Sequence, residues 1–298
     1  MIKDSLAIII ATKDRPQELK RLLVSIKAQE IKPSQIIIVD GGDGDLGDIL
    51  RSYSDFGIEY IKLIPPSLTK QRNAGIRAIR NDVTVVAFLD DDITLEKNSL
   101  VNMMKFWEYA SQETAGACFN NMSEPFKKPG LAEKIFFVNS DRPGTILPSG
   151  FQSIPCAVNI TMQVDWLIGC AMVYRRSIFN EFSFDEWFDG YARYEDVDFS
   201  YRVGKKYKMF VVAEAKVKHY VKLEKIENSF NLGKMEAINR LYFVKKNRNL
   251  SPILCCWSML GIMLNNIFKV MFGHGARYRL RANGAIAGFI ELFFKRKL

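Results

Sequence analysis

The stretch VVAFLDDD, residues Val85–Asp92, decides the fold because it joins a predicted buried strand directly to three carboxylates. Five consecutive apolar residues, β-branched at the start, are typical of a strand that is buried on both faces. Carboxylates this close together repel one another, and burying them without a partner is costly. Asp90 and Asp92 are two residues apart, so their side chains point the same way in an extended chain. The pattern therefore indicates a site for a hard divalent cation, and the alternative is a solvated acidic turn.

Strands and helices alternate in the first third of the chain. Two helices are predicted, the first from Pro16 to Ile26, where leucines recur at helical spacing, and the second from a cap at Ser67 or Thr69 to about Arg80. They separate predicted strands at residues 6–11, 35–39, 58–63 and 85–89. This alternation predicts the α/β class, with a doubly wound, mostly parallel sheet flanked by helices. Ligands of such sheets bind beyond the carboxyl ends of the strands, where the polar segments Thr12–Arg15, Asp40–Asp45 and Asp90–Asp92 lie.

The middle of the chain is less regular. Residues 120–155 are rich in Pro, Gly and Ser, which predicts a long excursion near the site with room for a short hairpin. Residues 164–174 have the composition of a strand. Acidic Glu195 and Asp196 open a predicted helix that runs to about Lys206, because acidic residues favour a helix N-terminus. Further elements are predicted as a helix at 95–109 and strands at 115–119 and 209–213.

Bulk composition limits the class of protein. A chain of 298 residues that is 48% hydrophobic and 25% charged suits one large domain or one domain with an appendage. Five cysteines without a Cys-x-x-Cys motif, and only two histidines, argue against a disulfide framework or a zinc site. This cysteine usage favours a protein that works in a reducing compartment. The N-terminal residues lead directly into a strand, so we expect no signal peptide.

The basic charge of the protein lies in its C-terminal quarter. Residues Ser229–Leu298 hold twelve Lys and Arg against two Glu, while the formal net charge of the whole chain is +9. We therefore divide the chain into a catalytic domain, 1–228, and a C-terminal helical region, 229–298. Helices are predicted at 232–246 and 285–294, and 253–272 is apolar almost throughout. One surface of this quarter is expected to meet an anionic partner.

The apolar segment 253–272 has the length of roughly 20 residues that a membrane span requires. Asn265, Asn266 and Lys269 interrupt it, and basic clusters flank it on both sides. We therefore predict helices that lie in the interface of an anionic membrane, on its cytoplasmic face, with the protein peripheral. The alternative is a helical cap packed on the catalytic domain, or a dimer contact. Nucleic acid is disfavoured as a partner because the same quarter is strongly apolar.

Seven short motifs occur in order between Ser5 and Tyr220. They are Ala11–Arg15, Val39–Gly42, Gln71–Gly75, Leu89–Asp92, Gly169–Ala171 ahead of Arg175, Glu195-Asp196 and His219. This ordered set resembles the family 2 glycosyltransferases, which have the GT-A fold. The resemblance implies an inverting enzyme that uses a nucleoside diphosphate sugar and a divalent metal, Mn or Mg. One departure concerns the second strand, where many members carry Asp-Asp-Gly-Ser and this chain has Asp40-Gly41-Gly42-Asp43.

The resemblance also implies roles for individual residues. Asp90 and Asp92 would bind the metal with His219, and Asp196 would be the catalytic base with Glu195 beside it. Binding of the nucleotide sugar would fall to Thr12, Asp14, Arg15, Asp40, Arg72, Asn73, Asp90 and Asp91, of which Arg72 and Asn73 would face the diphosphate or sugar. Weaker candidates for acceptor contacts are Trp166, Gly169 and Trp187.

Each assignment has a simpler alternative. Glu195 and Asp196 could only cap a helix dipole, and His219 could be an ordinary half-buried histidine. Arg72 and Asn73 could lie on a solvated helix face. The two tryptophans could belong to the core.

These features together predict transfer of a sugar, from a UDP-sugar by preference, to a hydroxyl of a saccharide or lipid-linked saccharide. The pathway would be synthesis of a surface polysaccharide or glycolipid. A cation would stabilise the charge on the leaving diphosphate, and a carboxylate would take the proton of the acceptor. A sugar-phosphate nucleotidyltransferase is the nearest alternative, but its Gly-rich loop after the first strand is absent from Thr12–Pro16. A basic nucleic-acid-binding protein is the alternative from another class.

Overall fold

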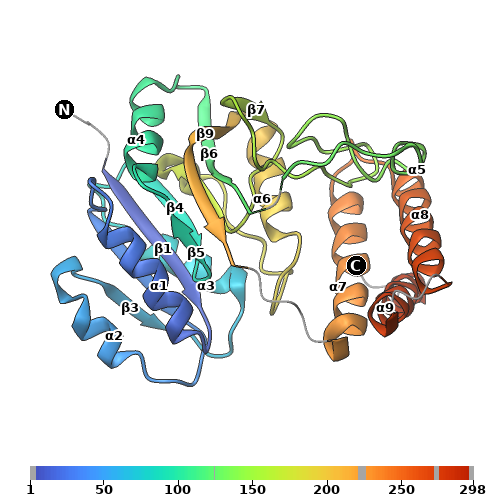
Figure 1. The fold of residues 1–298 in the computed structure, drawn as a ribbon, viewed down its shortest axis with the longest axis horizontal. Coiled ribbons are helices and arrows are strands. Elements are labelled where there is room, and N and C mark those ends of the chain that lie inside the picture. The colour runs from blue at the N-terminus through green and yellow to red at the C-terminus, as the bar shows by residue number, and fades with distance from the viewer. Residues whose placement is uncertain (1–4, 124, 221–225, 272–274, 295–298) are drawn as a thin grey trace. The chain divides into compact units, whose positions relative to one another are not determined.

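The computed structural model describes residues 5–123, 125–220, 226–271 and 275–294 (Figure 1). It divides into two compact units, which are described separately. Unit 1 is formed by residues 1–126 and 155–221, and unit 2 by residues 127–154 and 222–298. The segment 127–154 thus groups with the C-terminal helices, which the predicted boundary at residue 228 does not anticipate.

Unit 1 is built on a mixed sheet whose strand order is β3-β2-β1-β4-β8-β6-β9-β5, with β7 paired to β9. The first four strands in this order are parallel, as predicted. β8 lies antiparallel between β4 and β6, while β6 and β9 are parallel to each other. β5 and β7 pair antiparallel with β9. The strands are β1 (Leu6–Thr12), β2 (Gln35–Asp40), β3 (Glu59–Lys62), β4 (Val85–Asp90), β5 (Ile93–Leu95), β6 (Thr114–Asn121), β7 (Met162–Val164), β8 (Ala171–Arg175) and β9 (Lys208–His219).

Helices cover both faces of this sheet, so the continuous apolar strands β1, β2 and β4 are buried on both sides. Alternate residues of one strand enter different cores: Ile8 packs with α1 and α4, and Ile9 packs with α3. The predicted doubly wound α/β fold is therefore confirmed. The helices of unit 1 are α1 (Pro16–Lys27), α2 (Gly47–Ser52), α3 (Leu68–Arg77), α4 (Ser99–Tyr109) and α6 (Glu195–Gly204).

The prediction of one strand over residues 164–174 is wrong. The segment is split between β7 and β8, and α6 holds the connection between them: the backbone N–H of Leu167 donates to Ser200 Oγ at 3.1 Å, and that of Gly169 to Asp196 Oδ2 at 2.8 Å. Side chains therefore replace the ladder bonds that a strand would need. β9 is longer than predicted and carries His219 at its end.

The polar strand ends of unit 1 converge as predicted. Thr12 pairs in register with Asp40, and Ala11 pairs with Asp90, so the carboxyl ends of β1, β2 and β4 share one edge. The amide of Gln71 on α3 ties two of these ends together, since its Nε2 donates to the carbonyls of Thr12 at 3.0 Å and Val39 at 2.8 Å.

Unit 2 is helical, with α5 (Leu131–Ile135), α7 (Ser229–Lys246), α8 (Pro252–Met271) and α9 (Gly275–Phe294). α9 begins ten residues before its predicted start. It packs directly on the backbone of α7, because a Cβ atom on Gly284 would lie 1.9 Å from the carbonyl oxygen of Phe230. Trp257 of α8 donates from Nε1 to the carbonyl of Ile135 at 2.9 Å, so the 127–154 segment packs on α8.

Candidate active site

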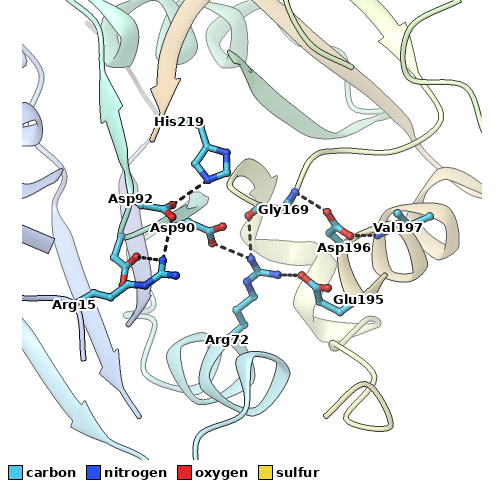
Figure 2. Close-up of polar contacts among 10 residues, drawn as sticks. Arg15, Arg72, Asp90, Asp92, Gly169, Glu195, Asp196, Val197 and His219 are labelled. Atoms are coloured by element: carbon cyan, nitrogen blue, oxygen red, sulfur yellow. Dashed lines mark hydrogen bonds and ion pairs between the residues drawn. The ribbon is translucent and has the colours of Figure 1, made fainter. Parts of the chain in front are cut away.

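Asp90 and Asp92 at the end of β4 meet His219 at the end of β9 (Figure 2). One ligand atom from each of the three lies within 4.8 Å of the others. His219 Nε2 is hydrogen-bonded to Asp92 Oδ1 at 3.0 Å. Two carboxylates and an imidazole at this spacing fit a divalent cation such as Mn²⁺. Within the described part of the chain, this group is the candidate metal site.

Asp91, the middle carboxylate, has other partners. It accepts hydrogen bonds from Thr12 Oγ1 at 2.7 Å and from Arg15 Nη1 at 3.1 Å, and it is 4% exposed. Burial raises the pKa of Asp91 to about 6, against the opposing effects of Thr12 and Arg15. Arg15 Nη1 also contacts Asp92 Oδ2 at 3.0 Å. Thr12 and Arg15, predicted as nucleotide contacts, therefore also hold the acidic motif in place.

Arg72 on α3 connects the acidic motif to α6. Its Nη2 donates to Asp90 Oδ1 at 3.2 Å and to the Gly169 carbonyl at 3.0 Å, and its Nη1 donates to Glu195 Oε1 at 2.7 Å. The side chain is buried, so the alternative of a solvated helix face is wrong for Arg72. In this structure its guanidinium is surrounded by protein groups, and its predicted contact with the diphosphate or sugar stays a prediction.

Glu195 and Asp196 at the start of α6 lie in different environments. Glu195 is buried against Arg72, and burial together with the charge of Asp196 raises its pKa to about 8. Asp196 is half-buried, and its two carboxylate oxygens accept from the backbone N–H groups of Gly169 and Val197, each at 2.8 Å. Burial raises the pKa of Asp196 as well. Of the pair, Asp196 is the more exposed residue.

A family model described as Glycosyl transferase family 2 matches residues 7–182, more than half of the chain. The chain belongs to this family. The matched region contains the acidic motif and Arg72, whereas the other site residues Glu195, Asp196 and His219 lie beyond it. Comparison with curated proteins gave no match.

Solved structures show the same fold. The mannosyltransferase PcManGT from Pyrobaculum calidifontis, in complex with GDP-Man and Mn²⁺, aligns with a TM-score of 0.62 at 10% identity, over 99% of this chain and 88% of that chain. TarS 1–349 from S. aureus aligns with a TM-score of 0.56 at 11% identity, over 98% and 82%. Its complex with UDP-GlcNAc aligns with a TM-score of 0.55 at 12% identity, over 96% and 81%. The predicted GT-A fold is therefore confirmed.

The predicted nucleotide contacts of this glycosyltransferase at β1 and β2 lie side by side. Asp14, at a positive φ of 52°, accepts from the Asp43 N–H at 2.9 Å. Asp40 is buried and accepts from Tyr60 Oη and Lys62 Nζ, both at 2.8 Å. The sequence analysis missed Tyr60 and Lys62. The parallel pairing of β2 with β3 would have indicated Lys62, since it stands opposite Asp40.

Asn73 on α3 holds a loop of the glycosyltransferase in place. Its Nδ2 donates to the Phe184 carbonyl and to Glu186 Oε1, both at 2.9 Å, and its Oδ1 accepts from the Phe184 N–H at 3.0 Å. The amide is thus engaged on both sides with residues 184–186. Its predicted contact with the diphosphate or sugar stays a prediction.

The two tryptophans proposed as acceptor contacts differ in exposure. Trp166 is 4% exposed, so the structure places it in the core, which was the simpler alternative. Trp187 is 37% exposed and packs edge-on against Phe188. Its loop is anchored to the start of α3, because Thr69 Oγ1 donates to the Phe188 carbonyl at 2.8 Å. Trp187 is therefore placed where a ligand could reach it.

Gly169, the third acceptor candidate, is next to the proposed base. A Cβ atom at this position would lie 2.9 Å from Asp196 Oδ2 and 3.0 Å from Asp196 Cβ. The absence of a side chain therefore allows the close contact between the Gly169 N–H and the Asp196 carboxylate.

Proposed function

We propose that this glycosyltransferase transfers a sugar from a nucleoside diphosphate sugar, by preference a UDP-sugar, to a hydroxyl of a saccharide or lipid-linked saccharide, with inversion. We place the reaction in the synthesis of a surface polysaccharide or glycolipid. The observation that carries the proposal is the convergence of Asp90, Asp92 and His219 on one point, with Asp196 connected to it through Arg72 and Gly169. The GDP-Man, UDP-GlcNAc and Mn²⁺ complexes of proteins with the same fold support it.

The donor set fits Mn²⁺ or Mg²⁺, which Asp90, Asp92 and His219 would hold. Such a cation, when bound, acts as a Lewis acid that stabilises negative charge on the leaving diphosphate. Arg15 fixes Asp92 from one side and Arg72 fixes Asp90 from the other. The two carboxylates repel each other, and the two arginines keep them oriented in spite of this repulsion.

Asp196 acts as the general base in this proposal. Two backbone N–H groups fix its carboxylate, and the remaining lone pairs can accept the proton of the acceptor hydroxyl. Glu195 does not compete for this role, because it is buried and paired with Arg72. One base opposite one leaving group gives a single displacement, which inverts the anomeric carbon.

The stereochemistry of the product tests this mechanism. The protein is incubated with Mn²⁺ and with octyl glycosides as acceptors. The donors are UDP- and GDP-sugars in which the sugar is α-linked to the diphosphate. We expect a β-linked product, identified by NMR from the one-bond coupling constant between C1 and H1 of the transferred sugar. A product that retains the α configuration would contradict the single displacement.

The outer face of α8 supports association with a membrane. Among the described helices, α8 is the one long and apolar enough to cross a bilayer, by length and composition only. Its opposite face is buried in unit 2 and includes Ser258 and Asn266. At 100° per residue the large apolar residues that are exposed form one stripe without a charge. An exposed apolar stripe of this kind marks an interaction surface. The stripe on α8, called the α8 stripe below, consists of Ile253, Trp257, Leu260, Leu264, Ile267, Phe268 and Met271.

We propose that this α8 stripe lies in the interface of an anionic membrane and does not span it. One face of the helix already packs on protein, and Lys269 is placed over the ring of Tyr278 at 4.8 Å. Exposed Lys245, Lys246 and Arg248 at the end of α7 supply positive charge for anionic headgroups. The glycosyltransferase would then be peripheral, on the cytoplasmic face, with a lipid-linked acceptor within the same surface.

Binding to vesicles tests the membrane proposal. We expect the full chain to co-sediment with phosphatidylglycerol-containing vesicles at low salt. The double variant Leu264→Asp/Phe268→Asp should bind at least about tenfold more weakly, since each removes an apolar contact worth about 1.5–3 kcal/mol when fully buried. Val24→Asp, on the exposed side of α1, is the matched control and should bind normally. A wild-type protein that stays unbound, or elutes as a dimer without vesicle affinity, would contradict the proposal.

A further inference from the structure

His219 is the last residue of β9, where the pairing of this strand with β6 has already ended. The register between the two strands runs as far as Asn121, which stands opposite Val217. On the other side, the three-residue strand β5 begins with Ile93 opposite His219. Strand ends that extend beyond their neighbours fray readily. A metal ligand at such a position therefore needs further contacts that hold its backbone.

A serine hydroxyl continues the pairing on the β6 side. A backbone hydrogen bond runs from the Met122 N–H to the Val217 carbonyl at 2.9 Å. Beyond it, the N–H of His219 donates to Ser123 Oγ at 2.7 Å. Asn121 brings the serine to this place, because its Oδ1 accepts from the Ser123 N–H at 3.0 Å in a turn that ends β6. Ser123 thus binds the main chain of the histidine itself.

Tyr220, the residue after the histidine, is held on the β5 side. Its N–H donates to the carbonyl of Asp92 at 2.9 Å. The Arg21 guanidinium of α1 lies over its ring, 4.3 Å from the centroid, where a cation is attracted to an aromatic face. Arg15, at the start of α1, contacts the Asp92 carboxylate at 3.0 Å. The beginning of α1 therefore holds Asp92 directly and His219 through the adjoining residue.

The place of the imidazole depends on this backbone. The ring nitrogen Nε2 of His219 faces Asp92 Oδ1 at 3.0 Å (Figure 2). One ligand atom from each of the three candidate ligands lies within 4.8 Å of the others. Distances between a metal and its ligands vary by only about 0.2 Å in proteins. A small displacement at the end of β9 would therefore take the imidazole out of bonding distance of a cation at the acidic motif.

We propose that Ser123 and Arg21 are positioning residues of the metal site, which fix the end of β9 from its two sides and keep the His219 imidazole directed at the cation. This inference rests on the proposed function, which supplies the cation. Neither side chain binds the cation in this assignment. Ser123 acts through the main chain of the histidine, and Arg21 acts through Tyr220.

Titration of the full chain with Mn²⁺ alone tests the proposal, with the free ion measured by its electron paramagnetic resonance signal. We expect Ser123→Ala to bind Mn²⁺ about tenfold more weakly than wild type, the lower end of the effect of partners that orient a metal ligand. Ser123→Thr keeps the hydroxyl and should bind within about twofold of wild type. Arg21→Gln should weaken binding about threefold, because its contact with the exposed Tyr220 ring is a surface cation–π pair.

Pulsed electron paramagnetic resonance gives a readout that is specific to the histidine. A directly bound imidazole nitrogen couples to the electron spin of Mn²⁺, and the coupling disappears when the nitrogen leaves the ion. We expect this nitrogen coupling in wild type and Ser123→Thr, a weaker signal in Ser123→Ala, and none in His219→Gln. Ser52→Ala is the matched control. It removes an exposed hydroxyl that donates to the Asp48 carbonyl at 2.8 Å, and it should leave the affinity and the coupling unchanged.

The outcomes separate this inference from the proposed function. If wild-type protein binds Mn²⁺ but Ser123→Ala and Arg21→Gln keep its affinity and its nitrogen coupling, the inference is overturned and the proposed function stands. If wild-type protein binds Mn²⁺ without a nitrogen coupling, His219 is not a ligand and the inference is overturned as well. If wild-type protein binds no Mn²⁺, the proposed function loses its cation and the inference fails with it. If Ser123→Ala does not fold, Arg21→Gln carries the test, because it keeps the hydrogen bond between Ser123 and His219.

Discussion

Asp196→Asn is expected to lower kcat by about 100- to 10,000-fold, the usual contribution of a general base, while the affinity for the nucleoside diphosphate changes little. The asparagine has the same shape but cannot take a proton from the acceptor. It keeps one of the two backbone hydrogen bonds, from either the Gly169 N–H in the loop or the Val197 N–H in α6. Steady-state rates of nucleoside diphosphate release, together with calorimetric affinities, measure the two quantities separately.

The pH profile provides a second readout for Asp196. Burial raises the pKa of this carboxyl above its ordinary 3.8, so kcat should fall as pH decreases through the raised value, where the base becomes protonated. Asp196→Asn should lose this acid limb. Asp165→Asn, at an exposed carboxylate before the same loop, is the control and should keep both the rate and the profile. Near-normal transfer by Asp196→Asn would show that another group removes the proton.

Asp92→Asn is expected to weaken metal-dependent nucleotide binding by at least about 100-fold, because even partners that only orient a metal ligand contribute 10- to 100-fold. The carboxylate is one of three groups whose ligand atoms lie within 4.8 Å of one another. Asparagine still offers hydrogen bonds to His219 and Arg15, so the fold should persist. The measurement is the thermal shift produced by a nucleoside diphosphate with and without Mn²⁺.

Asp82→Asn is the matched control for this variant. Asp82 is exposed and pairs with Arg80 on the surface, so its removal should leave the Mn²⁺-dependent shift unchanged. If Asp92→Asn keeps a wild-type shift with Mn²⁺, Asp92 does not bind the cation and the acidic motif has another role.

The part of the fold that could be predicted is the part that depends on hydrophobic pattern. Val85–Leu89 and the apolar runs before it are buried on both faces, and their alternation with amphipathic helices specifies a doubly wound sheet. The break between β7 and β8 could not be predicted, because it depends on Asp196 and Ser200 of α6, which accept from the backbone N–H groups of Gly169 and Leu167. The apolar composition of that segment is compatible with either arrangement.

The candidate site, like the fold, has one part that could be predicted from the sequence and one part that could not. The sequence placed Asp90, Asp92 and His219 together because the motifs occur in a recognisable order, and the structure brings their ligand atoms together. It did not indicate that Arg72 is enclosed between Asp90 and Glu195, since pairing across 123 residues depends on how α3 and α6 pack against the sheet. Lys62 was missed for a similar reason, because its contact with Asp40 follows from strand register.

Thermal stability against a panel of nucleoside diphosphates, with and without Mn²⁺, tests most directly the claim that this chain binds a nucleotide sugar through a cation. A ligand that binds only the folded state at 100 times its dissociation constant stabilises it by about 2.7 kcal/mol, which raises the melting temperature by several degrees in a domain of about 200 residues. We expect such a shift with one nucleoside diphosphate, dependent on Mn²⁺ and removed by EDTA. The absence of a shift with every nucleotide would contradict the account, and Asp90–Asp92 would then be an acidic turn held by Arg15 and Arg72.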